Sequence, residues 1–173
     1  MSNTATVTAP AGATETNLTN NSATDNDTVA DAPVNVGSFT PPQILTASGA
    51  PTGKPLTHGT QFTQTVFTVK DFDPNASVTD YTAVIVLGDG NTVTVNSTGV
   101  ISASNAATAA AAAGSHIVDT GNGTFSVVLT YTYQTAFTNH TFGVTLYDNG
   151  DGRDISDPTD SVANALTSTF TVK

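Results

Sequence analysis

VFTVKDFDPNASVTDYTAVIVLGDGN, residues 66–91, is the stretch that decides the fold class of this chain. Residues 131–151, YTYQTAFTNHTFGVTLYDNGD, have the same character. In both stretches, short runs rich in Thr, Val, Phe and Tyr alternate with turns made of Asp, Asn, Gly and Pro, and no long helical pattern interrupts them. This alternation is typical of an extracellular-type β-sandwich. We therefore predict an all-β fold, a Greek-key β-sandwich.

The same punctuation extends over residues 38–173, which we predict to be the sandwich. Residues 81–87 are apolar on both faces and predict a central strand. Gly88-Asp89-Gly90 predicts a tight hairpin turn, and the alanine-rich residues 103–114 predict one or two helical turns. Further strands are expected at residues 43–47, 62–70, 91–95, 124–133, 142–147 and 166–172, and residues 51–59 are expected to form a loop. The predicted core consists of the inward-facing residues Phe125, Val127, Leu129, Tyr131, Tyr133, Phe142, Val144, Leu146, Leu166, Phe170 and Val172.

Residues 1–37 are of a different kind. Between residues 1 and 33, only Val7, Leu18 and Val29 are large internal apolar residues, so this segment cannot form a core by itself. We predict an extended polar arm or linker with one strand around residues 4–8.

Composition limits the classes of partner. Thr occurs 34 times in 173 residues, which indicates much exposed sheet because Thr suits the solvent face of a strand. The net charge is −10 with four strong cations, so nucleic acid and anionic lipid are poor partners and cations are better ones. The absence of cysteine excludes disulfides and thiolate metal sites. No apolar run has the length of a membrane helix, and residues 1–3 begin no signal peptide. We expect either a mature fragment or a protein made inside the cell, such as a virion component.

Residues 67–76 (FTVKDFDPNA), 80–90 (DYTAVIVLGDG), 131–133 (YTY) and 144–150 (VTLYDNG) carry a resemblance to a known family. Over residues 38–173 the chain resembles the PKD-like (polycystic kidney disease type), immunoglobulin-like domains of large bacterial surface proteins. Leu87 stands where that family usually has Trp, and Tyr131 stands where it has His. The resemblance implies an immunoglobulin-like sandwich. Residues 3–29 resemble the closing strand and tail of another surface-protein repeat, which implies a repeat array or a donated strand.

The acidic loops predict a calcium site. In an immunoglobulin-like sandwich the loops after the second and sixth strands lie at one end. Calcium prefers six to eight oxygen ligands, and clustered carboxylates repel one another unless a cation intervenes. The predicted ligands are Asp71, Asp73, Asn75, Asp148, Asp151 and Asp154, with Asp80, Asn149 and Asp157 nearby. The alternative is that these side chains simply cap their own turns.

No catalytic constellation appears in the sequence, and we predict that the chain is not an enzyme. His58, His116 and His140 share no ligand spacing. Ser115, His116 and Asp119 contain the letters of a triad, but their spacing on an extended chain does not allow the hydrogen-bonded relay. Asp89 is interpreted as a turn residue, since no helix follows it to bind a phosphate.

Three functions remain open. The first is a structural or adhesive module of a bacterial surface or secreted protein, stiffened by calcium and located outside the cell. The second is a self-assembling subunit, such as a phage decoration protein or a filament subunit, whose arm contacts a neighbouring copy. The third and weakest is carbohydrate binding, which needs an exposed aromatic platform. Most aromatic residues fall on core faces, and only Phe137 and Tyr147 are left for that role.

Overall fold

The computed structural model describes residues 2–26, 34–148 and 165–173. The chain separates into two compact units, Met1–Asp31 and Ala32–Lys173, and each unit has strands of its own. The predicted arm, residues 1–37, therefore overlaps the second unit by its last six residues.

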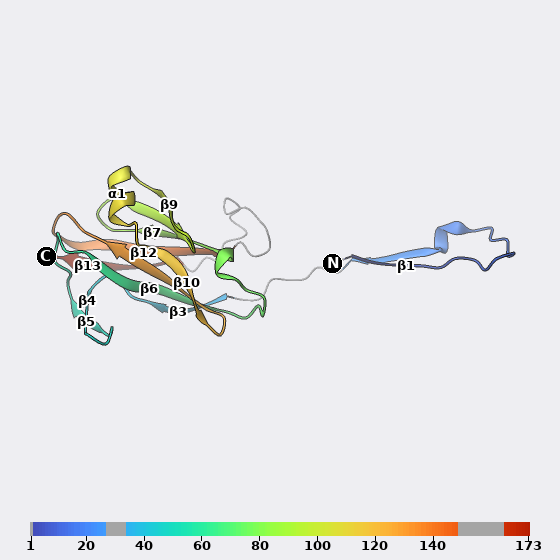
Figure 1. Ribbon diagram of the computed structural model, residues 1–173, viewed down its shortest axis with the longest axis horizontal. Coiled ribbons are helices and arrows are strands. Elements are labelled where there is room, and N and C mark those ends of the chain that lie inside the picture. Colours follow the sequence, from blue (N-terminus) through green and yellow to red (C-terminus); the bar gives the residue numbers. More distant parts are fainter. Residues whose placement is uncertain (1, 27–33, 149–164) are drawn as a thin grey trace. The chain divides into compact units, whose positions relative to one another are not determined.

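The first unit is a polar hairpin. Strand β1 (Ser2–Thr6) pairs antiparallel with β2 (Ser22–Asn26), and the short 3-10 helix η1 (Leu18–Asn20) precedes β2 (Figure 1). The Thr4 and Thr24 hydroxyls lie 3.0 Å apart across the pair. In residues 3–26 no side chain is buried, and the exposed fractions of Val7 and Leu18 are 73 % and 72 %. The sequence predicted one strand here, and β2 was missed because SATDN contains few residues with strand preference.

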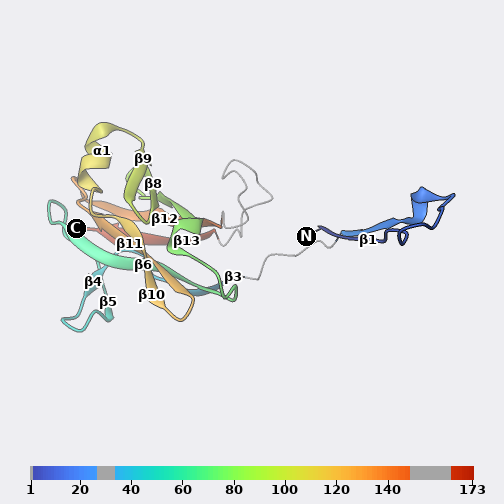
Figure 2. The same cartoon turned by 45° about the vertical axis from the view of Figure 1, so that its right-hand side comes forward.

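Nine of the described strands of the second unit form two layered antiparallel sheets (Figures 1 and 2). One sheet has the order β13 (Leu166–Val172), β12 (Phe137–Asp148), β7 (Tyr81–Val86), β8 (Thr92–Asn96) and β9 (Gly99–Ala103). The other has the order β10 (His116–Gly121), β11 (Thr124–Tyr131), β6 (Phe62–Asp71) and β3 (Val34–Phe39). A small hairpin joins β4 (Ile44–Leu45) and β5 (Pro51–Lys54), and helix α1 (Ala106–Ala111) follows β9.

The core lies between the two sheets. Tyr81 on β7 packs against Phe125 on β11 with their ring centroids 4.5 Å apart, and Phe39 on β3 stacks on Phe142 of β12 at 6.0 Å. Ten of the eleven predicted core residues are buried, and Leu166 at the start of β13 is half-buried. The prediction of an all-β sandwich is therefore confirmed at the level of two packed antiparallel sheets.

A bulge explains two consecutive buried residues. Val127 of β11 pairs with Phe67, and Val128 pairs with Thr65, so Val66 is the extra residue on β6. Both Val66 and Phe67 have no exposed surface. A bulge of this kind re-aims one side chain, so both neighbours reach the core.

The local sequence predictions succeeded where the pattern was strong. Strand β7 is central in its sheet, between β12 and β8, as expected for residues 81–87. Gly88 and Gly90 have positive φ values of 85° and 89°, and the Leu87 amide donates to the Asn91 carbonyl across 2.9 Å. Gly88-Asp89-Gly90 is thus the predicted hairpin turn. Helix α1 lies within the alanine-rich segment, with Asn105 as its N-cap.

Three strands of the sandwich and one in a predicted loop were missed. Strand β3 begins at Val34, before the predicted first strand at residues 43–47, and β5 lies inside the predicted loop 51–59. Strands β9 and β10 flank α1. A register shift interrupts β3 between Val36 and Ser38, and glycine suits position 37 because a Cβ there would lie 2.6 Å from the Thr68 hydroxyl oxygen. In each of these strands the alternation of apolar and polar residues is weak, so it is the pairing with a neighbouring strand that makes the segment a strand.

Candidate functional site

Two of the carboxylates predicted to bind calcium, those of Asp71 and Asp148, lie at the same end of the sandwich. Asp71 is the last residue of β6 and Asp148 is the last residue of β12. Asp148 is opposite Tyr81 in the β12–β7 pair, and the Tyr81 hydroxyl donates to Oδ2 of Asp71. The fold therefore brings Asp71 and Asp148 to the same buried tyrosine, although they are far apart in sequence.

The polar groups that follow Asp71 hold the loop in shape. Oδ1 of Asp71 accepts from the Asp73 amide at 2.7 Å, and Oδ1 of Asp73 accepts from the Asn75 amide at 2.8 Å. Oδ2 of Asp80 accepts from the Ser77 amide at 2.7 Å, in a capping box around the 3-10 helix η2 (Val78–Asp80). These bonds are the turn-capping role that was the alternative to calcium.

Tyr81 is the buried residue beside which both Asp71 and Asp148 lie. Its side chain has no exposed surface, and Asp71 and Asp148 are exposed by only 4 % and 7 %. Burial raises the pKa of Tyr81 far above its ordinary value, and the hydrogen bond to Asp71 and the charge of Asp148 raise this pKa further. A neutral phenol beside an ionised carboxylate is a stable arrangement, because the phenol donates a hydrogen bond that the carboxylate needs.

Only part of the predicted calcium site lies within the residues that the structure describes. Asp151 and Asp154, together with Asn149 and Asp157, lie outside the part of the chain that the structure describes. Within residues 2–26, 34–148 and 165–173, no three histidine or acidic side chains are grouped so that they could hold a metal ion. Asp71 and Asp148 supply buried carboxylates of the type that calcium prefers, and the oxygens of Asp71 are already engaged.

The three histidines have structural contacts. Each Nδ1 meets a backbone carbonyl: His58 meets Lys173 at 2.9 Å, His116 meets Gly114 at 2.9 Å and His140 meets Gly88 at 2.6 Å. His140 also stacks on Phe137 with a centroid distance of 4.5 Å. These rings tie loops to strands and lie on different segments of the second unit.

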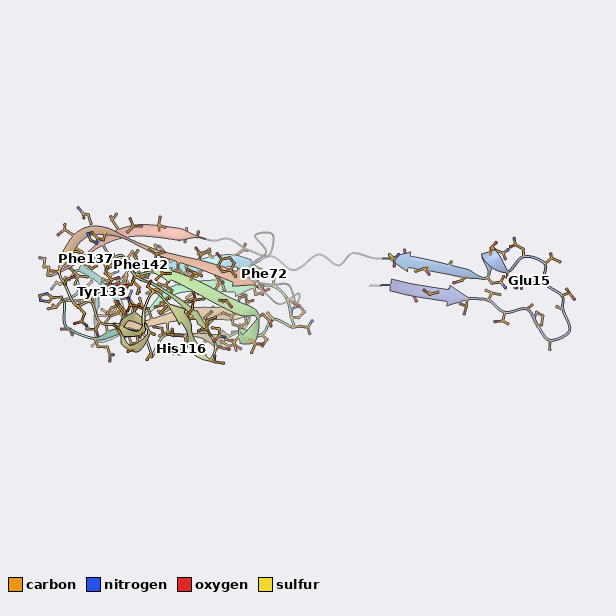
Figure 3. The ribbon with its side chains drawn as sticks, turned by 90° about the horizontal axis from the view of Figure 1, so that it is seen from above. Glu15, Phe72, His116, Tyr133, Phe137 and Phe142 are labelled. Carbon is orange, nitrogen blue, oxygen red and sulfur yellow. The ribbon has the colours of Figure 1, made fainter. Side chains whose placement is uncertain are left out.

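The aromatic residues correct one expectation. Phe137 is not a loose ring, because it packs edge-on against Tyr133 at 5.3 Å and Phe170 at 5.0 Å. Figure 3 shows Tyr133, Phe137 and Phe142 gathered at one end of the sandwich. Among the residues that the structure describes, the exposed aromatic ring is Phe72, with an exposed fraction of 55 %, and the sequence assigned it no role. Tyr147 is half-buried on β12.

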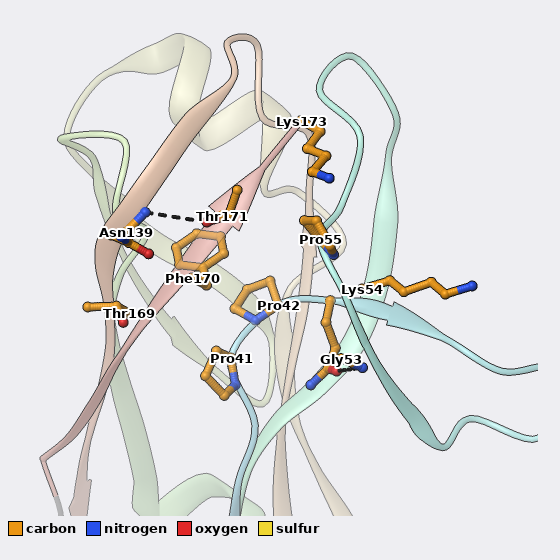
Figure 4. Close-up of a pocket in the computed structure, with 11 residues that line it drawn as sticks. Pro41, Pro42, Gly53, Lys54, Pro55, Asn139, Thr169, Phe170, Thr171 and Lys173 are labelled. Atoms are coloured by element: carbon orange, nitrogen blue, oxygen red, sulfur yellow. Dashed lines mark hydrogen bonds between the residues drawn. The ribbon is translucent and has the colours of Figure 1, made fainter.

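A pocket of about 440 Å³ lies beside the edge strand β13 (Figure 4). We call it the proline pocket, and its lining residues are Pro41, Pro42, Gln43, Gly53, Lys54, Pro55, Asn139, Thr169, Phe170, Thr171 and Lys173. Figure 4 shows Phe170 and Pro42 next to each other, with Lys54 and Lys173 at the margin. Two of the four strong cations of an acidic chain therefore border one apolar surface. Asn139 and Asp148 lie near opposite ends of β12, so this pocket is separated from Asp148 by most of the length of that strand.

Sequence reasoning missed the proline pocket because four separate segments supply its walls, and none of them has a recognisable motif.

Among the described residues, none of the helices combines the length and the hydrophobicity that a transmembrane span requires. Comparison with models of protein families, with curated proteins and with solved structures found nothing that matches this chain.

Proposed function

We propose that the chain is a non-enzymatic structural or adhesive module of a bacterial surface or secreted protein, with a PKD-like, immunoglobulin-like sandwich. The observation that carries the proposal is the use of its polar side chains. Asp71, Asp73 and Asp80 accept backbone amides of their own loop, and the histidines bond backbone carbonyls. Groups that serve catalysis in other proteins here support loop geometry around a packed core.

The positions of the motif residues support the PKD-like assignment. Leu87, in the place of the family's Trp, is fully buried, and its carbonyl accepts the Tyr133 hydroxyl at 3.0 Å. Tyr131, in the place of the family's His, donates to Oδ2 of Asp89 in the Gly-Asp-Gly turn at 2.9 Å. Both substitutions are thus accommodated by contacts between the YTY segment and the turn.

The mechanism of such a module is mechanical. A core shared by two sheets keeps the unit rigid, and exposed strand edges and surface pockets provide contacts. The proline pocket and the adjoining edge of β13 are the surfaces that suit this role. Calcium at the end formed by Asp71 and Asp148 would stiffen the module by joining carboxylates that otherwise repel one another. A location at the cell surface or outside the cell belongs to this proposal.

A second function is favoured by the hairpin of the first unit. An isolated two-stranded hairpin is marginally stable in water, and this one exposes Val7 and Leu18 without a core to bury them. Such a hairpin gains stability by adding its strands or its apolar side chains to another molecule. On this alternative the chain is an assembly subunit of a virion or a filament.

Sedimentation velocity over a range of protein concentrations distinguishes the two functions. The variant V7N/L18N removes both exposed apolar side chains, and T8N/T16N is a matched control on the same hairpin. The structural-module proposal predicts that the full chain and both variants sediment as monomers. Species that grow with concentration, persist in T8N/T16N and disappear in V7N/L18N would overturn the monomeric module and support the assembly subunit.

A further inference from the structure

A second, more polar cavity lies beside the Gly-Asp-Gly turn. Its volume is about 340 Å³, which is near the lower end of the range for small-molecule sites. The turn, helix α1 and the segment after β11 supply its walls. The lining residues are Asp89, Asn91, Asn105, Ala107, Thr108, Ala111, Tyr131, Thr132, Gln134 and Thr135. We call this cavity the Asp89 pocket.

The lining chemistry favours a neutral, hydrogen-bonding ligand. The walls carry one carboxylate, three side-chain amides, three threonine hydroxyls and one phenol, and they contain no Lys, Arg or His. An anion therefore finds no counter-charge there. A calcium ion finds a single carboxylate, and each of its oxygens already accepts a hydrogen bond, from the Asn91 amide at 3.1 Å and from the Tyr131 hydroxyl at 2.9 Å.

The polar groups are fixed in place by one another. Oδ1 of Asn105 caps α1 by accepting from the Thr108 amide at 2.9 Å, while its Nδ2 donates to Oδ1 of Asn91 at 3.1 Å. The side chain of Tyr131 is exposed by only 3 %, and its hydroxyl orients the Asp89 carboxylate by donating a hydrogen bond to it. The site is thus organised in advance, which lowers the entropic cost of binding.

Some acceptor positions and one N–H group of this network remain available, and together they indicate a particular class of ligand. Each carboxylate oxygen of Asp89 has a second acceptor position, and the amide nitrogen of Asn105 has a second N–H. A vicinal diol matches this set, because its hydroxyls can donate to Asp89 and accept from Asn105. We propose that the Asp89 pocket binds one ring of a neutral carbohydrate. The proposal goes beyond the structural role, which does not depend on this cavity.

This mode of recognition differs from an aromatic platform. Tyr131 is too buried to stack on a sugar ring, so edge-on hydrogen bonds to Asp89, Asn105 and the exposed Gln134 must supply the binding. Gln134 has only a long bond to the Thr132 carbonyl, at 3.4 Å, and is therefore available to a ligand.

The test is a titration of the full chain followed by NMR. Methyl glycosides of glucose, galactose, mannose and N-acetylglucosamine are added up to about 50 mM, since single rings bind at about millimolar strength. We expect saturable shifts of the side-chain amides of Asn91, Asn105 and Gln134 with at least one glycoside. Saturation with none of them would overturn the proposal, and so would the same shifts on addition of calcium chloride alone.

Asn105→Ser provides the decisive variant, because serine keeps the N-cap of α1 and removes the amide. Asn17→Ser is the matched control, since Asn17 caps η1 with the same kind of bond, to the Thr19 amide at 3.1 Å. We expect N105S, and Gln134→Ala as a second variant, to bind the glycoside roughly threefold to tenfold more weakly, the effect of losing one hydrogen bond. N17S should bind as the unchanged protein does. Equal affinity in all of these proteins would place the sugar elsewhere and overturn the assignment.

Discussion

Tyr81 and Asp71 show how a buried polar pair is maintained in this sandwich. The tyrosine hydroxyl donates to the carboxylate, and the Asp73 amide donates to the other oxygen of the same group. Without the phenol, the buried carboxylate would lose one of its donors, and desolvation would no longer be offset. The pair joins the end of β6 to the start of β7, where the chain crosses from one sheet to the other.

Tyr81→Phe is therefore expected to destabilise the protein by about 1–3 kcal/mol, which is the cost of leaving a buried acceptor without its donor. Tyr147→Phe is the matched control, because Tyr147 lies half-buried on β12 and its hydroxyl forms no hydrogen bond with the described residues, and it should change stability by less than about 0.5 kcal/mol. Urea unfolding of both variants measures the difference. Equal losses would show that the phenol–carboxylate bond contributes nothing.

The buried tyrosines also predict a loss of stability in alkali. Burial is the main cause that raises the pKa of Tyr81, Tyr131 and Tyr133 above the ordinary value, and hydrogen bonds to Asp71 and Asp89 add to the shift of the first two. Below about pH 10 the phenols are protonated in both the folded and the unfolded chain, so stability is unaffected. Above it the unfolded chain releases protons that the folded chain retains, so stability falls by up to about 1.4 kcal/mol per pH unit for each tyrosine.

Urea midpoints between about pH 8 and pH 11 measure this slope, and Tyr131→Phe should reduce it by the contribution of one tyrosine. A slope that is unchanged by this substitution would contradict the assignment of Tyr131 to the protected set.

At the scale of elements, the turn between β7 and β8 depends on two glycines for different reasons. Both have positive φ, where a side chain is strained. At Gly88 a Cβ would also lie 2.7 Å from a Phe170 ring carbon and 3.0 Å from the Thr141 carbonyl oxygen, whereas at Gly90 it would meet nothing within 4 Å. Gly88 thus combines a conformational need with close packing of β13 against the turn.

Gly90→Ala should cost about 1–2 kcal/mol, from backbone strain alone. Gly88→Ala should cost about 1–3 kcal/mol more, because the added methyl group must displace Phe170 or the β12 backbone. Thermal or urea unfolding of the two variants checks the order. Equal destabilisation would indicate that Phe170 yields without cost.

At the scale of the whole molecule, the net charge of −10 and the buried carboxylates suggest a cation-dependent stability. An ion bound only by the folded chain raises the free energy of unfolding by about 2.7 kcal/mol at a hundred times its dissociation constant. For a unit of this size that corresponds to an increase in melting temperature of roughly 5–10 °C.

We predict that millimolar calcium raises the melting temperature relative to chelator, and that Asp148→Asn removes most of this increase. Asp25→Asn is the control, because Asp25 is an exposed carboxylate on the hairpin of the first unit. Calorimetric scans of the full chain with calcium and with chelator provide the measurement. An identical melting temperature in both conditions would exclude a stabilising calcium site.

The sequence by itself determined the layered all-β character, the central strand β7, the Gly-Asp-Gly turn and helix α1. These features follow from short-range chemistry: alternating burial along a strand, positive φ at glycine and the helix preference of alanine. The inward-facing residues of β11 and the second half of β12 could be listed one by one, because large apolar residues recur there at every second position and are buried.

Only the tertiary structure decided which distant residues meet. The bond between Tyr131 and Asp89 spans 42 positions, and Phe170 fills the space that Gly88 leaves open. Strands β3, β9 and β10 form because neighbouring strands satisfy their backbone groups, and their own residues show little periodicity. The proline pocket and the Asp89 pocket arise in the same way, from loops that the paired sheets bring together, and local sequence patterns carry no record of that proximity.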